Sequence, residues 1–527
     1  MRVKLLRENV LNVIPQVCSE RGKLITESYR ETEGYPMVIR RAKALEKILA
    51  NMTIYINDEE LIVGNQASSP RAAPIFPEFS VNWLEKELGE FSNRDLDKFL
   101  VPEQTIDEIK EICAFWKGKT VQDRAVSLYS LLLGKKNLSY DLEFPEINSV
   151  VAHIISVGEG YGHIIPNYQK LMAKGIKGIV NEAQEILKDL KIIKNQDDVE
   201  KSVFLQAVIT SCNAATRFIE RFAEEAKSLK KKETSLQRKE ELEKIADVCT
   251  WIKGNPPRNF WEALQLILFI HFIIQIESNG HAVSLGRLDQ YLYPFYQRDI
   301  KEGRITEEEA VELLECSLIK CHELIKTRSW RCTPYKTGYP LFQTISLGGT
   351  KRDGSDATNE LSYLFLKAVA EVKIPQPTLV VLIHNKTPNK FLIECWRTVR
   401  QHGGGMPGFF NNEVAVLSLV RAGASVEDAR EWAVVGCSEI IIPGKGNSIL
   451  NGGGCYINTL KILELILKNS ISFNTFDDLK RVFRQELAFY MKYVPLLVSV
   501  TVKAHKELAP TPFLSSLIDY RLEIGKD

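Results

Sequence analysis

Short apolar runs alternate with helical segments in the second half of this 527-residue chain. The runs are rich in β-branched and aromatic residues, and each is followed by a stretch with helical periodicity. This alternation predicts βαβ units, and therefore a parallel sheet or barrel. The runs are LFQTISLGG (341–349), PTLVVLIHN (377–385), MPGFFNN (406–412) and EWAVVGCSE (431–439), and the helical segments are 356–372, 388–402, 413–421 and 456–468.

The ends of these predicted strands carry polar side chains, namely Gln343, His384, Asn411 and Cys437. In parallel α/β folds, functional groups collect at strand ends and in the loops that follow them. We therefore expect a functional site at one edge of the predicted sheet.

The first half of the chain is mainly helical in pattern, with clear 3.6-residue periods in 36–51, 169–193 and 200–229. The charge-rich run 228–245 predicts a solvated helix pair with its turn. Residues 64–84 are irregular and predict a long ordered loop. We expect 1–260 to form a mainly helical portion and 261–527 to form the barrel strands and helices with the Cys437 loop.

The apolar stretch from Phe260 to Ile276 imitates a membrane span, but it contains Glu262, Gln265 and His271 and is marginal in length. We interpret it as a buried core helix. The N-terminus has no secretory signal pattern. We expect a cytoplasmic protein without a membrane partner.

Lys and Arg total 68 against 67 Asp and Glu, which argues against nucleic acid as the main partner. The ten cysteines show no CxxC pairing, as is typical of reduced thiols in a cytosolic enzyme. Cys316, Cys321 and His322 lie in a helical pattern, so we do not expect them to bind a metal.

The segment AVVGCSE (433–439) places a thiol, Cys437, two positions before a carboxylate, Glu439. In an extended segment, these side chains point to the same face. Three interpretations stay open on the residues alone. Cys437 is a buried structural thiol, a nucleophile activated by His384 or His281, or a thiol that carries a radical beside a carboxylate base.

From about residue 30 to the last residue, the chain resembles the glycyl radical enzymes. It is most similar to the branch that contains glycerol dehydratase, propanediol dehydratase and choline lyase. The segments that carry the resemblance are RRAKALEKIL (40–49), ELIVGNQASSPRAAPIFPEFS (60–80), GHIIPNYQKLMAKG (162–175), NGHAVSLGRLDQYLYPFY (279–296), DATNELSYLFLKA (356–368), GASVEDAREWAVVGCSE (423–439) and PTPFLSSL (510–517).

The resemblance implies a ten-stranded α/β barrel with two finger loops meeting inside. Cys437 would be the thiyl site and Glu439 the general base. His163 and His281 match substrate-binding positions, and Asn451 aligns with a substrate-binding Asp of the polyol enzymes. This Asn and Ala282, which stands where that branch usually has a Ser, indicate a pocket less selective for a small polyol.

The resemblance also implies a radical-bearing glycine in an RVxG-type motif, and no such motif occurs in residues 1–527. We therefore expect an α/β fold that is an incomplete ten-stranded barrel with a large helical N-terminal part. A C-terminal segment or companion chain would supply the glycine, and the isolated chain would be inactive. A radical S-adenosylmethionine activating enzyme with an iron–sulfur cluster would install the radical. No cofactor or metal would be bound, and a homodimer is expected.

The leading hypothesis is a glycyl radical lyase that eliminates water, or a similar leaving group, from a small hydroxylated substrate under anaerobic conditions. Within the family, an arylacetate-type decarboxylase or a C–N or C–S lyase is the alternative. Pyruvate formate-lyase chemistry is disfavoured because Gly436 and Ser438, not a second cysteine, flank Cys437. The alternatives from other classes are a non-catalytic remnant or scaffold subunit and a hydrolytic cysteine enzyme.

Overall fold

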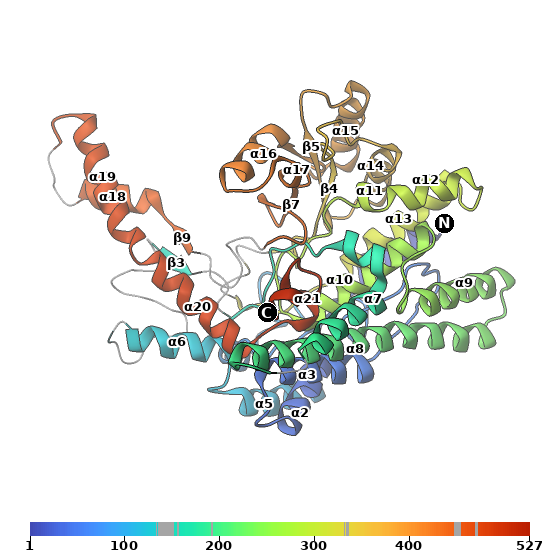
Figure 1. Cartoon of the computed structure of the whole chain (residues 1–527), viewed down its shortest axis with the longest axis horizontal. Helices are drawn as coiled ribbons and strands as arrows, with labels where there is room; N and C mark the ends of the chain where they lie inside the picture. Colours follow the sequence, from blue (N-terminus) through green and yellow to red (C-terminus); the bar gives the residue numbers. More distant parts are fainter. Residues whose placement is uncertain are drawn as a thin grey trace.

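The computed structural model describes residues 1–132, 134, 152–154, 158–190, 193–330, 333, 337–446, 455–468 and 473–526. Long helices of the first half line one side of the molecule, and the sheet with its helices lies on the other (Figure 1). Helices α18 (Thr459–Lys468) and α19 (Phe476–Met491) extend away from both parts, and α20 (Val494–Leu508) leads back to the helical side, where it packs against α6 (Figure 1). The largest cluster of buried apolar side chains includes residues from Leu6 to Leu522, so both halves of the chain share one core.

The helical side is built from amphipathic helices, as the periodicities predict. The helix α8 packs against α3, α7 and α9. The turn between α8 and α9 is closed by Ser235, whose side chain accepts a hydrogen bond from the backbone N–H of Arg238. The helices of this side are α2 (Glu20–Glu31), α3 (Met37–Asn51), α4 (Asn82–Glu87), α5 (Glu103–Trp116), α6 (Val121–Leu132), α7 (Tyr168–Asp189), α8 (Gln196–Lys232) and α9 (Leu236–Ile252), whereas α1 (Arg2–Asn12) packs against α13 (Glu307–His322) and α14 (Glu360–Val372).

Helix α10 (Phe260–Glu277) is the apolar segment that resembled a membrane span, and every side chain in it except Trp261 is buried. Its polar groups find partners inside the protein. Gln265 exchanges hydrogen bonds with the backbone of Val63, and His271 contacts Gln343. The prediction of a core helix is confirmed. Of the described residues, one other helical stretch, 476–508, has the length and apolar character of a membrane span.

The sheet contains three parallel strands in the order β4–β5–β6, and helices α14 and α15 connect them. Two of the predicted βαβ units are therefore present, with strands shorter than predicted, whereas the fourth predicted strand (431–439) does not join these parallel strands. Gln343 lies just before β4, not at a functional strand end as we expected. Asn411 ends β6 and caps α16 through the N–H of Val414. The bounds are β4 (Thr344–Gly348), α14 (Glu360–Val372), β5 (Thr378–Ile383), α15 (Asn389–His402), β6 (Gly408–Asn411) and α16 (Asn412–Arg421).

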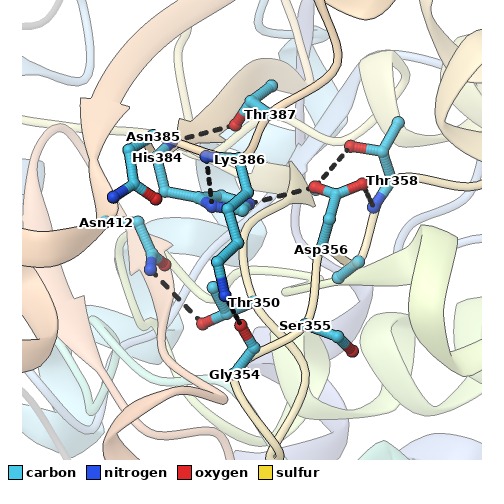
Figure 2. A network of polar contacts seen from close by, with 12 residues as sticks. Thr350, Gly354, Ser355, Asp356, Thr358, His384, Asn385, Lys386, Thr387 and Asn412 are labelled. Atoms are coloured by element: carbon cyan, nitrogen blue, oxygen red, sulfur yellow. Dashed lines mark hydrogen bonds and ion pairs between the residues drawn. The ribbon is translucent and has the colours of Figure 1, made fainter.

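A polar network closes the carboxyl ends of β4 and β5 (Figure 2). Nε2 of His384 lies 3.0 Å from Oδ1 of Asp356, and Nδ1 of His384 accepts the backbone N–H of Lys386. The backbone N–H of His384 donates to Thr387. Both ring nitrogens of His384 are therefore engaged in holding the loops that follow the strands.

The segment AVVGCSE is not continuously extended, in contrast to the prediction. It forms a β-hairpin in which β7 (Ala433–Val435) pairs antiparallel with β8 (Glu439–Ile441), with Val435 opposite Glu439. Gly436, Cys437 and Ser438 form the connecting turn. Gly436 has a φ of 61°, a left-handed conformation that glycine adopts without steric cost, and this reverses the chain at the thiol.

Strand β7 runs antiparallel to β4. The backbone N–H of Val434 donates to Oγ of Ser346, and Oγ1 of Thr344 donates to the carbonyl of Gly436. The hairpin turn therefore lies at the beginning of β4. His384 follows β5 at the opposite edge of the sheet. This excludes His384 as the base for Cys437.

Three irregular segments, which contain His163, Ala282 and Phe342, extend the sheet on the side of the hairpin. The N–H of His163 donates to the carbonyl of His281 (2.7 Å), and the N–H of Ala282 donates to the carbonyl of Leu341 (2.8 Å). His163, Ala282 and Phe342 all have positive φ, an uncommon conformation for residues other than glycine. The backbone is thus strained at the residues that face the hairpin turn.

Gly162 and Gly280 allow this close approach of the backbones. A Cβ at Gly162 would lie 1.9 Å from the carbonyl oxygen of His281, so we expect Gly162→Ala to destabilise the fold by at least about 2 kcal/mol. Urea unfolding would measure the loss. The matched control is Gly89→Ala, where a Cβ meets nothing within 4 Å and the expected change is below about 0.5 kcal/mol. Equal stability of the two variants would contradict the geometry.

The remaining elements complete the described chain. Strand β1 pairs parallel with β2, and β3 pairs antiparallel with β9. Their bounds are β1 (Gln16–Cys18), β2 (Ala72–Pro74), β3 (Ala152–Ile154), α11 (Leu288–Tyr291), α12 (Tyr293–Lys301), α13 (Glu307–His322), α17 (Val426–Ala429), β9 (Cys455–Ile457), α18 (Thr459–Lys468), α19 (Phe476–Met491), α20 (Val494–Leu508), α21 (Pro512–Ser516) and α22 (Arg521–Ile524).

Candidate active site

The hairpin turn brings a thiol, a carboxylate and a histidine to one place. Cys437 is exposed at the tip of the turn. A Cβ built on Gly436 would lie 2.8 Å from Oε2 of Glu439, 3.0 Å from Cβ of Ala282 and 3.2 Å from Nδ1 of His163. These three residues therefore surround the backbone immediately before the thiol. Only glycine fits at position 436, both for space and for its positive φ.

Glu439 and His163 form a close electrostatic pair, with Nδ1 of His163 3.0 Å from Oε1 of Glu439. At this distance the two atoms form a close pair without the alignment of a regular hydrogen bond. Partial burial opposes ionisation of Glu439, but His163 outweighs it and holds the pKa of this carboxyl below its ordinary value. Glu439 is thus a carboxylate at neutral pH and can accept a proton.

His281 lies beside His163, with 5.8 Å between the ring centroids, and it packs edge-on against Phe342 at 4.7 Å. Its Nδ1 lies 2.6 Å from Nη2 of Arg328, and Nη1 of the same guanidinium lies 2.5 Å from Oε1 of Glu159. A chain of polar side chains thus leads from the paired histidines into the body of the protein.

Hydroxyl groups on neighbouring segments hold the base of the hairpin. Oγ of Ser284 accepts the N–H groups of Gly436 (3.3 Å) and Thr344 (3.2 Å). Together with the Thr344 and Ser346 bonds, these contacts fix where the turn emerges from the sheet. The position of Cys437 is therefore set by short polar side chains that the prediction did not name.

The structure places His163 and Glu439 beside the Cys437 turn and His281 next to His163, and the roles predicted for these residues stay predictions. Asn451, the fifth predicted site residue, lies outside the described residues. Arg328 and Glu159 were missed, because neither stands in a recognised motif. The sequence shows only that Arg328 is basic and Glu159 acidic, and it does not show that the two residues contact each other.

The other thiols that the structure describes are buried, and burial raises the pKa of Cys316 and Cys321. A raised pKa keeps a thiol protonated and unreactive. Within the described ranges, no group of three or more His, Cys, Asp or Glu side chains has the geometry of a metal site. Cys316, Cys321 and His322 lie on α13 and at its end, as predicted, and serve the core.

Known proteins match this chain along its whole length. A sequence model of the pyruvate formate lyase-like family matches residues 1–527. The (2S)-3-sulfopropanediol dehydratase of Klebsiella oxytoca is 33% identical over 550 residues, covering 100% of this chain and 65% of that protein. The trans-4-hydroxy-L-proline dehydratase of Clostridioides difficile is 32% identical and covers 100% of this chain and 67% of that protein.

Solved structures give the same result for the fold. The glycerol-bound B12-independent glycerol dehydratase from Clostridium butyricum superimposes with a TM-score of 0.93 at 37% identity, covering 100% of this chain and 67% of that chain. The fold is thus that of the glycyl radical enzymes. The chain belongs to the pyruvate formate lyase-like family. It spans about two thirds of the length of the relatives that it matches.

Proposed function

We propose that this chain is the thiyl-bearing part of a glycyl radical lyase that eliminates water from a small hydroxylated substrate. The observation that carries the proposal is the pairing of Glu439 with His163 directly beside the turn that presents Cys437. A thiol that exchanges a hydrogen atom and a carboxylate that accepts a proton are the two groups that such an elimination needs.

The radical-bearing glycine would lie outside residues 1–527, and an activating enzyme of the radical S-adenosylmethionine type would install its radical. When present, that glycine supplies a site that takes the hydrogen atom of the Cys437 thiol. Cys437 fits such an exchange, because its side chain is exposed at the tip of a turn and is not packed into the core. Another backbone segment can therefore approach the sulfur.

In the proposed elimination, the sulfur of Cys437 takes a hydrogen atom from the substrate carbon that bears a hydroxyl. Glu439 accepts the proton of that hydroxyl, which leaves a ketyl-type radical. The neighbouring C–O bond then breaks, and the leaving hydroxide takes up a proton and departs as water. The product radical recovers a hydrogen atom from the Cys437 thiol, so the thiyl is regenerated and no external oxidant or reductant is consumed.

The charges around the histidines favour a neutral substrate. Of the described groups, Glu439 contacts His163, and Arg328 contacts His281 while it is paired with Glu159. The guanidinium of Arg328 is thus committed to protein partners, and its charge is already balanced by Glu159. An anionic substrate, such as a sulfonate, would need a cation from elsewhere. We therefore propose a neutral vicinal diol or polyol as the substrate class.

A substrate screen tests this proposal. The activated protein, with the radical-bearing glycine present, would be incubated anaerobically with glycerol, 1,2-propanediol, isethionate, an amino alcohol and an arylacetate. We expect an aldehyde from a neutral diol. Release of sulfite, an amine or carbon dioxide in its place would support the C–S lyase, C–N lyase or decarboxylase alternative. Absence of any turnover would support the non-catalytic scaffold.

Replacing the proposed base tests its role separately. Glu439→Gln keeps the shape of the side chain but cannot accept a proton, so we expect kcat to fall about 10²- to 10⁴-fold. The matched control is Glu431→Gln, which removes a carboxylate just before the same hairpin, where Glu431 pairs with the exposed Arg352. Steady-state kinetics on both variants would decide. A Glu439→Gln enzyme with unchanged kcat would remove Glu439 from the mechanism.

A further inference from the structure

The hydrogen bond between Arg328 and His281 fixes a property of the histidine that distances alone do not give. A guanidinium has only N–H donors and no acceptor, and it remains protonated at any physiological pH. Nη2 of Arg328 lies 2.6 Å from Nδ1 of His281. Nδ1 must therefore present its lone pair, and the imidazole proton must reside on Nε2.

We infer that Arg328 is a positioning residue that holds His281 as the neutral Nε2–H tautomer. His281 then offers a hydrogen-bond donor at Nε2, and a second proton on Nδ1 is excluded while the guanidinium occupies that position. This inference deepens the proposed function and rests on it for the role of His281, because a neutral donor suits a substrate hydroxyl and does not require a charged substrate.

The guanidinium is itself held from two sides. Nη1 of Arg328 lies 2.5 Å from Oε1 of Glu159, and both side chains are nearly buried, with 8% and 14% of their surface exposed. The carbonyl of Arg328 accepts a hydrogen bond of 2.9 Å from Arg94, whose side chain is fully buried. Because the charge of Arg328 is paired and its backbone is hydrogen-bonded, its guanidinium is held in place and can fix the orientation of the His281 ring.

Glu159 is anchored in turn by a distant element. Nε2 of His505, on α20, lies 2.7 Å from the carbonyl oxygen of Glu159. Burial lowers the pKa of His505, while the carbonyls of Glu159 and Thr501 at its two ring nitrogens oppose that shift. The path from α20 through Glu159 and Arg328 to His281 is therefore continuous, and each link is a contact between buried or nearly buried groups.

The neighbouring Lys326 supports the same segment without touching the histidine. Its Nζ donates to the carbonyls of Ser278 (3.1 Å) and Gly280 (2.9 Å), and burial lowers the pKa of this amine. Lys326 thus holds the backbone that carries His281, and Arg328, two positions further along the chain, holds its ring. Because Arg328 contacts the imidazole ring and Lys326 does not, Arg328 is the residue to replace in a test.

The tautomer can be measured without turnover. The chain has eight histidines, so nuclear magnetic resonance of the chain labelled with ¹⁵N-histidine, with His281→Gln for assignment, would resolve the ring nitrogens. We expect Nδ1 of His281 to be unprotonated and Nε2 to be protonated in the wild-type chain. A protonated Nδ1 in the wild-type chain would overturn the inference, whatever the variants show.

Variants add the causal test. Arg328→Met should release His281 into a mixture of tautomers and, in the activated enzyme, lower kcat at least about tenfold. Arg328→Lys, which keeps the charge but lacks the forked geometry, should restore part of both properties. Arg397→Met is the control, because Arg397 is exposed on α15 and pairs only with Glu394 among its described neighbours. A folded Arg328→Met chain with the wild-type tautomer would refute a positioning role.

Two further outcomes separate this inference from the proposed function. If Arg328→Met does not fold, Glu159→Gln takes its place, since it leaves Arg328 but removes the charge that holds it. A mixture of His281 tautomers in Glu159→Gln supports the inference, and the unchanged wild-type tautomer opposes it. If the wild-type tautomer is the expected one but no diol is converted, the proposed function fails while the role of Arg328 stands.

Discussion

Replacing Cys437 with serine is expected to abolish turnover of the activated protein, by roughly 10⁴-fold or more. The hydroxyl has the shape of the thiol, but its O–H bond is too strong to exchange a hydrogen atom with carbon in the proposed cycle. Because Cys437 lies in an exposed turn, the change should leave the fold intact. Product formation from the preferred diol is the measurement, and thermal unfolding would verify that the variant is folded.

The control for this prediction lies next to the thiol. Ser438→Ala changes another exposed side chain of the same turn and should retain activity within a few-fold, since only the backbone N–H of Ser438 contacts Glu439. Turnover by Cys437→Ser above a hundredth of the wild-type rate would exclude a thiyl mechanism. Loss of activity in both variants would indicate that the turn itself, and not the sulfur, is required.

Glu78→Gln is expected to cost the largest amount of stability of any change considered, about 3–5 kcal/mol. The carboxylate of Glu78 is buried between two guanidiniums, 2.5 Å from Arg21 and 2.8 Å from Arg41. Both arginines also donate to carbonyls at the end of α10, those of Ile276 and Glu277. The amide would remove the carboxylate that two buried guanidiniums share, and Arg41 would keep only the charge of Glu277, just before the segment that carries His281.

The contacts of Glu78 with Arg21 and Arg41 also make the free energy of unfolding depend on pH, in a direction that can be worked out. Burial opposes ionisation of Glu78, but Arg21 and Arg41 outweigh it and hold its pKa below the ordinary value. The stabilisation is therefore present above the unfolded pKa of about 4.3 and is lost as the pH falls through the lower folded pKa. The difference in unfolding free energy between wild type and Glu78→Gln should be constant from pH 7 to about 5 and shrink in more acidic solution.

Urea unfolding across this pH range would measure the difference, with Glu394→Gln as the control. Glu394 pairs with Arg397 on the exposed face of α15, and such surface pairs contribute at most about 1 kcal/mol. A Glu78→Gln protein as stable as Glu394→Gln at pH 7 would show that the buried charges are compensated in some other way.

Most of the fold could be predicted because its signals are local. The alternation of apolar runs and helices gave β4 to β6 with their connecting helices, and the apolar α10 was assigned to the core from its internal polar residues. The β7–β8 hairpin was missed for a conformational reason. Gly436 reverses the chain through a positive φ, and a period of two along the sequence carries no information about such a turn.

The part of the candidate site that lies in recognisable sequence motifs could be predicted. Cys437, Glu439, His163 and His281 stand in segments that resemble a known family, and the structure groups them. Arg328 and Glu159 are 169 residues apart, and their pairing depends on how distant segments meet in the fold. No periodicity or spacing encodes such a contact, so a sequence argument alone could not assign Arg328 to the ring of His281.

The most direct test of the account follows the hydrogen atom that Cys437 is proposed to move. A mixture of unlabelled diol and diol deuterated at the carbon that bears the reacting hydroxyl would be converted by the activated protein and its product examined by mass spectrometry. The account predicts a primary isotope effect and deuterium at the neighbouring carbon of the product, where the thiol returns it. A product without deuterium at the neighbouring carbon, formed with no isotope effect, would contradict hydrogen transfer through Cys437.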